Sequence, residues 1–314
     1  MEVRAIRPGT PRVVSFANQK GGVGKTTTSV NLAAALALRG HRVLVVDVDP
    51  QSNATTGLGI DHRSLERSTY DLMVNGTSAR AVVRSTGIKG LDCLPAAPDL
   101  AGAEIELVEV TAREGRLAEA LEGAISAYDL VFVDCPPSLG LLTVNALAAA
   151  QDLVVPVQCE YYALEGLGQL MSTAERVQGG LNSDLRIAGF VLTMYDARTR
   201  LSSQVAGEVR GHFGDSVFET VVPRSVRLSE APSFGEPVLT LDPSSRGALS
   251  YRLLAGEYEG RFGLATHIPA PPPRSAASRE AVTPGPGGRG FGVKAPSPGD
   301  LEAAWPPAPP WSGS

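Results

Sequence analysis

Lysine is scarce in this chain. Only four of its 28 basic residues are lysines, yet Lys20 and Lys25 lie within six residues of each other. Composition alone would rarely place two of four lysines so close together. A lysine ammonium is a compact point charge that fits inside a tight loop, whereas the planar guanidinium of arginine does not. The pair therefore indicates a site that requires small, concentrated positive charges.

Long apolar runs and closely spaced cysteines are also missing. No stretch approaches the roughly 20 apolar residues that span a bilayer, and no apolar signal segment follows Arg4 and Arg7. Cys93, Cys135 and Cys159 are isolated, without the spacing of a metal site or of a disulfide framework. We therefore expect a cytoplasmic protein, with cysteines that are simply buried in a reducing environment.

An excess of positive charge is absent as well. The net charge is −5, and residues 186–261 contain nine arginines and nine acidic residues. Binding to nucleic acid would therefore need a local basic patch created by folding or by dimerisation.

The chain length of 314 residues suits one α/β domain of about 250 residues with an extension. Apolar segments alternate with helical ones, which predicts a mostly parallel, twisted sheet with helices on both faces. Strands are expected at 12–17, 42–46, 130–133, 153–157, 187–193 and 217–222, and helices after residue 25 and near 139–149, 164–177 and 201–213.

Composition divides the chain into three parts. We expect a short N-terminal arm at 1–11, a folded domain at 12–262 and a disordered tail at 263–314. From residue 266 onward the tail holds 12 of the 24 prolines, with glycine and serine between them, and it cannot bury enough apolar surface to order itself. Both tryptophans lie in this tail. Residues 300–311 are either a short docking motif or part of a spacer.

The most informative segment is SFANQKGGVGKTT, residues 15–27. An ordinary phosphate-binding loop reads G-x-x-x-x-G-K-[ST]. Here Gln19 occupies the first glycine position, and Lys20 follows it as an additional lysine. An apolar strand precedes the loop, and a helical pattern follows it up to Gly40, which is a typical stop. This strand-loop-helix context is the one that the phosphate-loop motif requires.

The glycines allow the loop to turn its N–H groups toward one point, and the helix N-terminus adds partial positive charge. A nucleoside triphosphate with Mg²⁺ is the expected ligand, although a glycine-rich turn that binds nothing is the simpler alternative. Lys25 would contact the β- and γ-phosphates, and the Thr26 hydroxyl would contact Mg²⁺. The predicted nucleotide-binding residues of the loop are Gly21, Gly22, Val23, Gly24, Lys25, Thr26 and Thr27.

Carboxylates follow two of the predicted strands. Asp47 and Asp49 come directly after the strand at 42–46, and Asp134 follows the strand at 130–133. The carboxyl ends of parallel strands form the edge at which such sheets bind ligands. One aspartate would orient a water molecule and others would support the metal shell. The alternative is that they are turn or helix-capping residues.

Together these segments resemble the ParA/Soj/MinD group of deviant phosphate-loop ATPases, whose hallmark is the additional lysine. Residues 160–166, 193–199 and 222–233 narrow the resemblance to the ParA/Soj chromosome-partitioning branch. The similarity extends over residues 12–260. Ser225 and Glu236 differ from the asparagine and lysine that are common in the family.

The resemblance implies a role for individual residues. Lys20, Lys25 and Asp49 would be catalytic, with Lys20 reaching the phosphates of the partner across a homodimer interface. Mg²⁺ would be held by Thr26, Asp134 and Asp47. Pro223 and Arg224 would lie beside the adenine of ATP or ADP, and Arg198 and Arg227 would contact DNA without sequence preference.

The same resemblance implies a function. The protein would be a nucleoid-associated ATPase that binds nonspecific double-stranded DNA as an ATP dimer. Hydrolysis stimulated by a ParB-type partner would release it, which would move or position chromosome or plasmid cargo. One alternative is a MinD-like membrane-associated ATPase, which needs a basic amphipathic C-terminal helix. Residues 251–264 are the candidate for it, but they include Glu257 and Glu259. A second alternative, an iron–sulfur carrier, lacks suitably paired cysteines.

Overall fold

The computed structural model describes residues 11–161, 163–164 and 166–264. The chain divides into two units, 1–269 and 270–314, and all described residues belong to the first unit. Nearly all of the predicted N-terminal arm and tail, together with Trp305 and Trp311, lie outside the described residues, so these parts of the domain division stay predictions.

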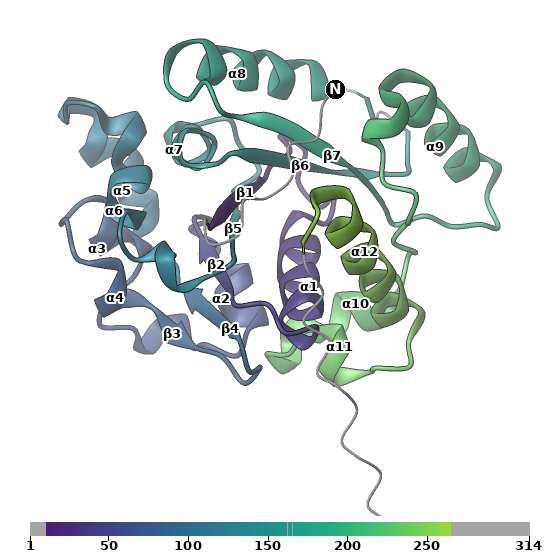
Figure 1. Cartoon of the computed structure of the whole chain (residues 1–314), viewed down its shortest axis with the longest axis horizontal. Coiled ribbons are helices and arrows are strands. Elements are labelled where there is room, and N and C mark those ends of the chain that lie inside the picture. The colour runs from purple at the N-terminus through teal and green to yellow at the C-terminus, as the bar shows by residue number, and fades with distance from the viewer. Residues whose placement is uncertain (1–10, 162, 165, 265–314) are drawn as a thin grey trace, which may run out of the picture. The chain divides into compact units, whose positions relative to one another are not determined.

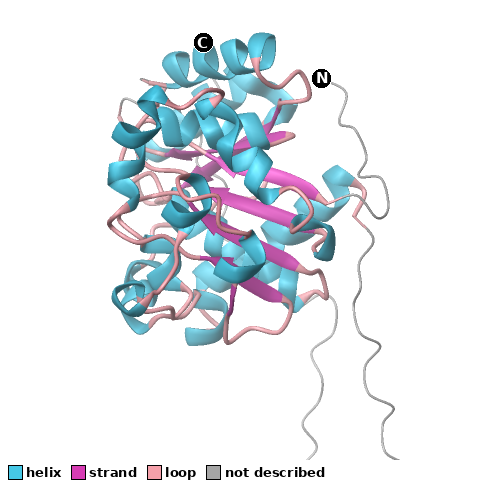
Figure 2. Ribbon diagram, turned by 90° about the vertical axis from the view of Figure 1, so that its left-hand side faces the viewer, coloured by secondary structure: helices cyan, strands magenta, loops and turns pink. Residues whose placement is uncertain are grey.

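A seven-stranded sheet forms the centre of the first unit, in the order β3-β4-β2-β5-β1-β6-β7 (Figures 1 and 2). All neighbouring strands are parallel except β3 and β4, which pair antiparallel. The strands are β1 (Arg12–Phe16), β2 (Val43–Asp47), β3 (Arg84–Ser85), β4 (Leu91–Leu94), β5 (Leu130–Asp134), β6 (Asp152–Gln158) and β7 (Arg186–Thr193).

Helices lie on both sides of the sheet, as Figure 2 shows. One face packs against α1 (Lys25–Leu38), α2 (Asn53–Gly57), α10 (Val226–Glu230), α11 (Val238–Leu241) and α12 (Arg246–Phe262). The other face packs against α3 (Thr69–Met73), α4 (Ala79–Val82), α5 (Leu100–Glu106), α6 (Arg116–Leu121), α7 (Leu141–Ala149), α8 (Leu167–Gly180) and α9 (Arg200–Phe213). None of the described helices is both long and apolar enough to cross a bilayer.

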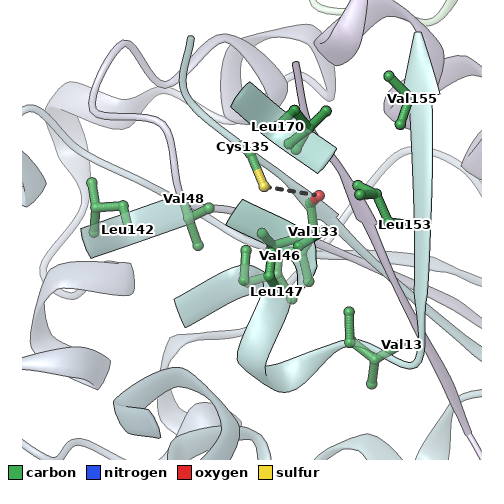
Figure 3. Close-up of a cluster of buried hydrophobic side chains, with 14 of the residues drawn as sticks. Val13, Val46, Val48, Val133, Cys135, Leu142, Leu147, Leu153, Val155 and Leu170 are labelled. Carbon is green, nitrogen blue, oxygen red and sulfur yellow. Dashed lines mark hydrogen bonds between the residues drawn. The ribbon is translucent and has the colours of Figure 1, made fainter. Parts of the chain in front are cut away.

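The central strands contribute apolar side chains to two hydrophobic clusters, one on each face of the sheet. In β5, Val131 and Val133 belong to the cluster under α7 and α8, while Leu130 and Phe132 belong to the cluster under α1 and α12. Figure 3 shows part of the first cluster, in which Val13, Val46, Val133 and Leu153 come from four neighbouring strands. Alternating side chains of a strand point to opposite faces, so a strand covered on both faces has to be apolar throughout.

The predicted parallel α/β sheet is confirmed, but the strand expected at 217–222 is wrong. This segment forms one isolated bridge, Val217 with Phe190, and the next bridge, Pro223 with Tyr195, lies just beyond its end. The backbone N–H groups of residues 219 and 220 donate instead to the Glu257 carboxylate, at 2.7 and 2.9 Å. Because a side chain of α12 takes these donors, no continuous ladder forms beside β7.

We expect Glu259→Gln to lower the free energy of unfolding by about 1–3 kcal/mol at neutral pH. Glu259 is buried and accepts hydrogen bonds from Arg39 and, at 2.8 Å, shares one with His41. Burial opposes ionisation, but the bonds and charges of Arg39 and His41 lower the pKa of Glu259 below its usual 4.5. Its contribution is therefore present above that pH and is lost as the pH falls through the lowered pKa.

Urea unfolding at several pH values measures this effect. Glu119→Gln is the control, because Glu119 pairs with Arg116 on the surface and exposed pairs contribute less than about 1 kcal/mol. Equal destabilisation by the two substitutions would contradict the assignment.

Candidate nucleotide-binding site

The sheet topology brings the loop and the carboxylates to one edge. β5 lies between β1 and β2, and the registers pair Phe16 with Asp134 and Asp47 with Asp134. All three strands run parallel, so their carboxyl ends and the segments that follow them converge. In the sheet, β2 lies on one side of β1, and β6 is added later on its other side. Such a reversal of strand order is the topological switch point at which these sheets bind ligands.

The loop after β1 has the backbone conformation that its glycines allow. Gly22 and Gly24 have φ angles of +72° and +86°, a left-handed region that disfavours other residues. Helix α1 begins immediately afterwards at Lys25, and its N-terminus receives no hydrogen bond from a side-chain cap. Such an end presents backbone N–H groups and a partial positive charge to an anion.

Lys25 is buried, with 7% of its surface exposed. Its Nζ donates a 3.3 Å hydrogen bond to the backbone carbonyl of Lys20. Burial lowers the pKa of Lys25, while the nearby Asp134 and Asp49 carboxylates act in the opposite direction. The ammonium of Lys25, the first residue of α1, therefore contacts the backbone of Lys20 in the preceding loop.

Thr26 and Asp134, both predicted as metal-site residues, are in direct contact. The Thr26 hydroxyl donates to Asp134 Oδ2 at 2.7 Å, and the Ser29 hydroxyl donates to Oδ1 at 2.9 Å. Burial and the negative charge of Asp47 raise the pKa of Asp134, and the two hydroxyl donors partly counter that rise. Helix α1 thus fixes both oxygens of this carboxylate.

Asp47 is fully buried, and both of its carboxylate oxygens are held. Its Oδ2 accepts hydrogen bonds from the Thr55 backbone N–H (2.9 Å) and hydroxyl (2.7 Å), and its Oδ1 accepts from the Asp49 backbone N–H (3.1 Å). Burial raises the pKa of Asp47, and these bonds act in the opposite direction. Asp49 begins the turn that follows, where its Oδ1 accepts from the Gln51 N–H.

The predicted adenine-side residues lie beside the end of β7. The Thr193 hydroxyl donates to the carbonyl of Val23 at 2.7 Å, which fixes the phosphate loop to this strand. Two residues later, Tyr195 forms a backbone bridge with Pro223, and the Arg224 N–H donates to the Tyr195 carbonyl at 3.0 Å. The Arg224 side chain forms an ion pair with Glu160.

Arg198 and Arg227 are both exposed, and both are paired with acids. Arg198 contacts Asp196 at 2.8 Å, and Arg227 contacts Glu230 at 3.1 Å and Asp242 at 3.4 Å. The structure does not bring these arginines into the nucleotide site.

Three supporting residues escaped the sequence reasoning. Ser29 could have been found, because it lies one helical turn after Thr26 and therefore shares its face. Thr55 is only eight residues from Asp47, but no local pattern indicated its contact with that carboxylate. Thr193 begins a segment that supported the family resemblance, but its contact with Val23, 170 residues away, could not be predicted from local sequence. In the described residues, no three histidine, cysteine, aspartate or glutamate side chains gather as a metal cluster. The donor set is one hydroxyl with carboxylates, which suits Mg²⁺ held mainly through phosphate and water oxygens.

We expect Thr55→Val to cost about 1–3 kcal/mol of unfolding free energy, because it leaves Asp47 and the Ala96 N–H without the hydroxyl that each contacts. Thr173→Val is the matched control. Thr173 is also buried in a helix, but its hydroxyl donates to a carbonyl of its own helix, Gln169. Chemical denaturation measures both variants, and equal losses would contradict an anchoring role for Thr55.

Comparison with known proteins identifies the family. A family described as an AAA domain matches residues 11–187. The chain is 56% identical to the sporulation initiation inhibitor protein Soj of Bacillus subtilis (strain 168), over 78% of this chain and 97% of that protein. It is 53% identical to the chromosome partitioning protein ParA of Caulobacter vibrioides (strain NA1000 / CB15N), over 80% and 94% of the two chains.

A solved structure agrees with these relatives in fold. Cobyrinic acid a,c-diamide synthase from Mycobacterium smegmatis, crystallised with bound ADP and magnesium, superposes with a TM-score of 0.70 at 40% identity, covering 79% of this chain and 93% of that one. The relatives named Soj and ParA are more similar in sequence and are covered almost completely. The chain therefore belongs to the ParA/Soj family of chromosome-partitioning proteins.

Proposed function

We propose that this protein is an ATP-dependent DNA-segregation ATPase of the ParA/Soj type. The observation that carries the proposal is the convergence of a two-lysine phosphate loop with Asp47, Asp49 and Asp134 at one edge of the sheet. ATP would bridge two protomers, the dimer would bind double-stranded DNA without sequence preference, and hydrolysis stimulated by a ParB-type partner would release it.

The nucleotide would occupy the loop between β1 and α1. Backbone N–H groups of residues 21–27 and the Lys25 ammonium would bind the phosphates. Thr26, Asp134 and Asp47 would hold Mg²⁺, and the metal would supply positive charge to the phosphates. ADP with magnesium in the Mycobacterium smegmatis structure supports this choice of ligand.

Asp49 is the proposed orienting group for the attacking water. It lies 5% exposed in the turn after β2, adjacent to Asp47, whose carboxylate fixes the Asp49 backbone. A carboxylate in this place can accept a hydrogen bond from water while Lys25 and Mg²⁺ hold the phosphates. Lys20 of each protomer would contact the phosphates of the other, so that hydrolysis depends on dimerisation.

Binding to DNA is the proposed output of the ATP state. Residues 186–261 contain as many acidic residues as arginines, so this region has no excess of positive charge. Arg198 and Arg227 are each paired with acids. Two protomers side by side would double the number of arginines available to one DNA duplex. The resulting affinity would be largely electrostatic and would fall steeply with salt.

The membrane-associated alternative is supported less well. Its candidate helix, α12, buries Tyr251, Leu254, Tyr258 and Phe262 in the core, so these side chains are not available to a lipid surface. The iron–sulfur alternative is also weaker, because Cys93, Cys135 and Cys159 are all buried as free thiols.

We expect Asp49→Ala to bind ATP and to accumulate as a dimer, because the nucleotide contacts remain while hydrolysis stops.

Lys20→Ala should bind ATP but stay monomeric. Lys25→Ala should lose affinity for nucleotide by at least about tenfold, since it removes the buried phosphate contact. Light scattering after gel filtration, with and without Mg-ATP, measures the oligomeric state. Rapid turnover by Asp49→Ala would overturn its assignment.

We expect Arg227→Glu to weaken DNA binding by about tenfold or more without affecting the ATP dimer, and to lower the slope of log affinity against log salt by about one. Arg42→Glu is the control. Arg42 is similarly exposed and is also paired with an acid, Asp129, but it precedes β2 at the opposite edge of the sheet. Equal losses in the two variants would mean that charge in general, rather than a site at α10, governs binding.

A further inference from the structure

Asn18 lies between the end of β1 and Lys20, and it is 3% exposed. Its side chain bonds in two directions. The amide Nδ2 donates to the carbonyl of Pro156 at 2.8 Å, and the carbonyl Oδ1 accepts from the backbone N–H of Lys20 at 3.0 Å. One buried carboxamide therefore joins the loop that carries Lys20 to strand β6.

The sequence of β6 explains why a side chain makes this connection. The last backbone bond of the β1–β6 ladder runs from the Ala17 N–H to the Val154 carbonyl at 3.3 Å. In a parallel ladder the next bond would come from the N–H of residue 156, and Pro156 has none. The ladder stops there, the chain turns into the loop, and Asn18 takes the Pro156 carbonyl.

Lys20 is held on both sides of its α-carbon in this structure. Asn18 holds its N–H, and the Lys25 ammonium holds its carbonyl at 3.3 Å. A bound phosphate would compete with that carbonyl for the Lys25 ammonium, because a charged acceptor makes the stronger bond. Asn18 then remains as the contact that fixes the backbone of Lys20.

We propose that Asn18 is the positioning residue for Lys20, and that it directs this lysine toward the phosphates of the partner protomer in the ATP state. The inference rests on the proposed cross-interface role of Lys20. A fixed backbone reduces the conformational freedom that the long lysine side chain must lose when it binds across the interface. Asn18 itself needs no contact with nucleotide.

Asn18→Ala in the full chain tests the proposal. We expect ATP affinity, measured with a fluorescent ATP analogue, to stay within about threefold of the wild type. The dissociation constant of the ATP dimer, measured by sedimentation in the Asp49→Ala background, should rise about tenfold or more. In a Lys20→Ala background, measured at protein concentrations high enough to detect residual dimer, Asn18→Ala should add little to the loss, because a residue that acts through Lys20 has no effect once Lys20 is removed.

Asn145→Ala is the matched control. Asn145 is fully buried, and its carboxamide also joins separate elements, accepting from the Leu117 N–H at 3.1 Å and donating to the Arg113 carbonyl at 2.9 Å. It should lower thermal stability as much as Asn18→Ala does, or more, and leave the dimer constant unchanged.

Each other outcome decides against the proposal. Unchanged dimerisation of Asn18→Ala, while Lys20→Ala is monomeric, would overturn the role of Asn18 alone. A dimer that survives Lys20→Ala would overturn the cross-interface role of Lys20, and the inference with it. Loss of ATP binding by Asn18→Ala, or an additive effect in the Lys20→Ala background, would mean that Asn18 shapes the whole loop instead.

Discussion

Two buried carboxylates facing each other across neighbouring strands impose the constraint on which the site depends. Asp47 and Asp134 are paired in the register of β2 and β5, and both are fully buried. Like charges in a low-dielectric setting repel, and burial disfavours the charged form of each. The hydroxyls of Thr26, Ser29 and Thr55 supply hydrogen bonds in compensation. Such an arrangement is stabilised further by a cation, which is what Mg-ATP would bring.

The positive charges at this edge are correspondingly few and well placed. Lys25 is buried beside the carboxylates, and its ammonium donates a hydrogen bond to the backbone carbonyl of Lys20. The neighbouring strands β6 and β7 fix this loop through Asn18 and Thr193, each by one side-chain hydrogen bond to a backbone carbonyl. The nucleotide loop is therefore anchored to strands on one side of β1 and faces the carboxylates of β2 and β5 on the other.

Much of the fold and the centre of the site could be predicted from the sequence, for identifiable reasons. Apolar runs ending in Asp47 and Asp134 predicted parallel strands, and the glycines before Lys25 predicted the loop, because these patterns are local. The strand expected at 217–222 failed because a distant residue, Glu257, takes its backbone donors. Thr193 was missed for the same reason, since only the folded chain brings it to Val23. Thr55 is only eight residues from Asp47, but its contact with that carboxylate depends on the turn between them, which the local pattern did not reveal.

A DNA-linked ATP switch is best tested by the affinity for a nonspecific DNA duplex, measured with ATP, with ADP and without nucleotide at low and moderate salt. The Asp49→Ala variant would hold the ATP state during the measurement. We expect salt-sensitive binding with ATP only, because two protomers must join before enough arginines face one duplex. Equal binding in all three states, or none in any, would contradict a DNA-linked ATP switch.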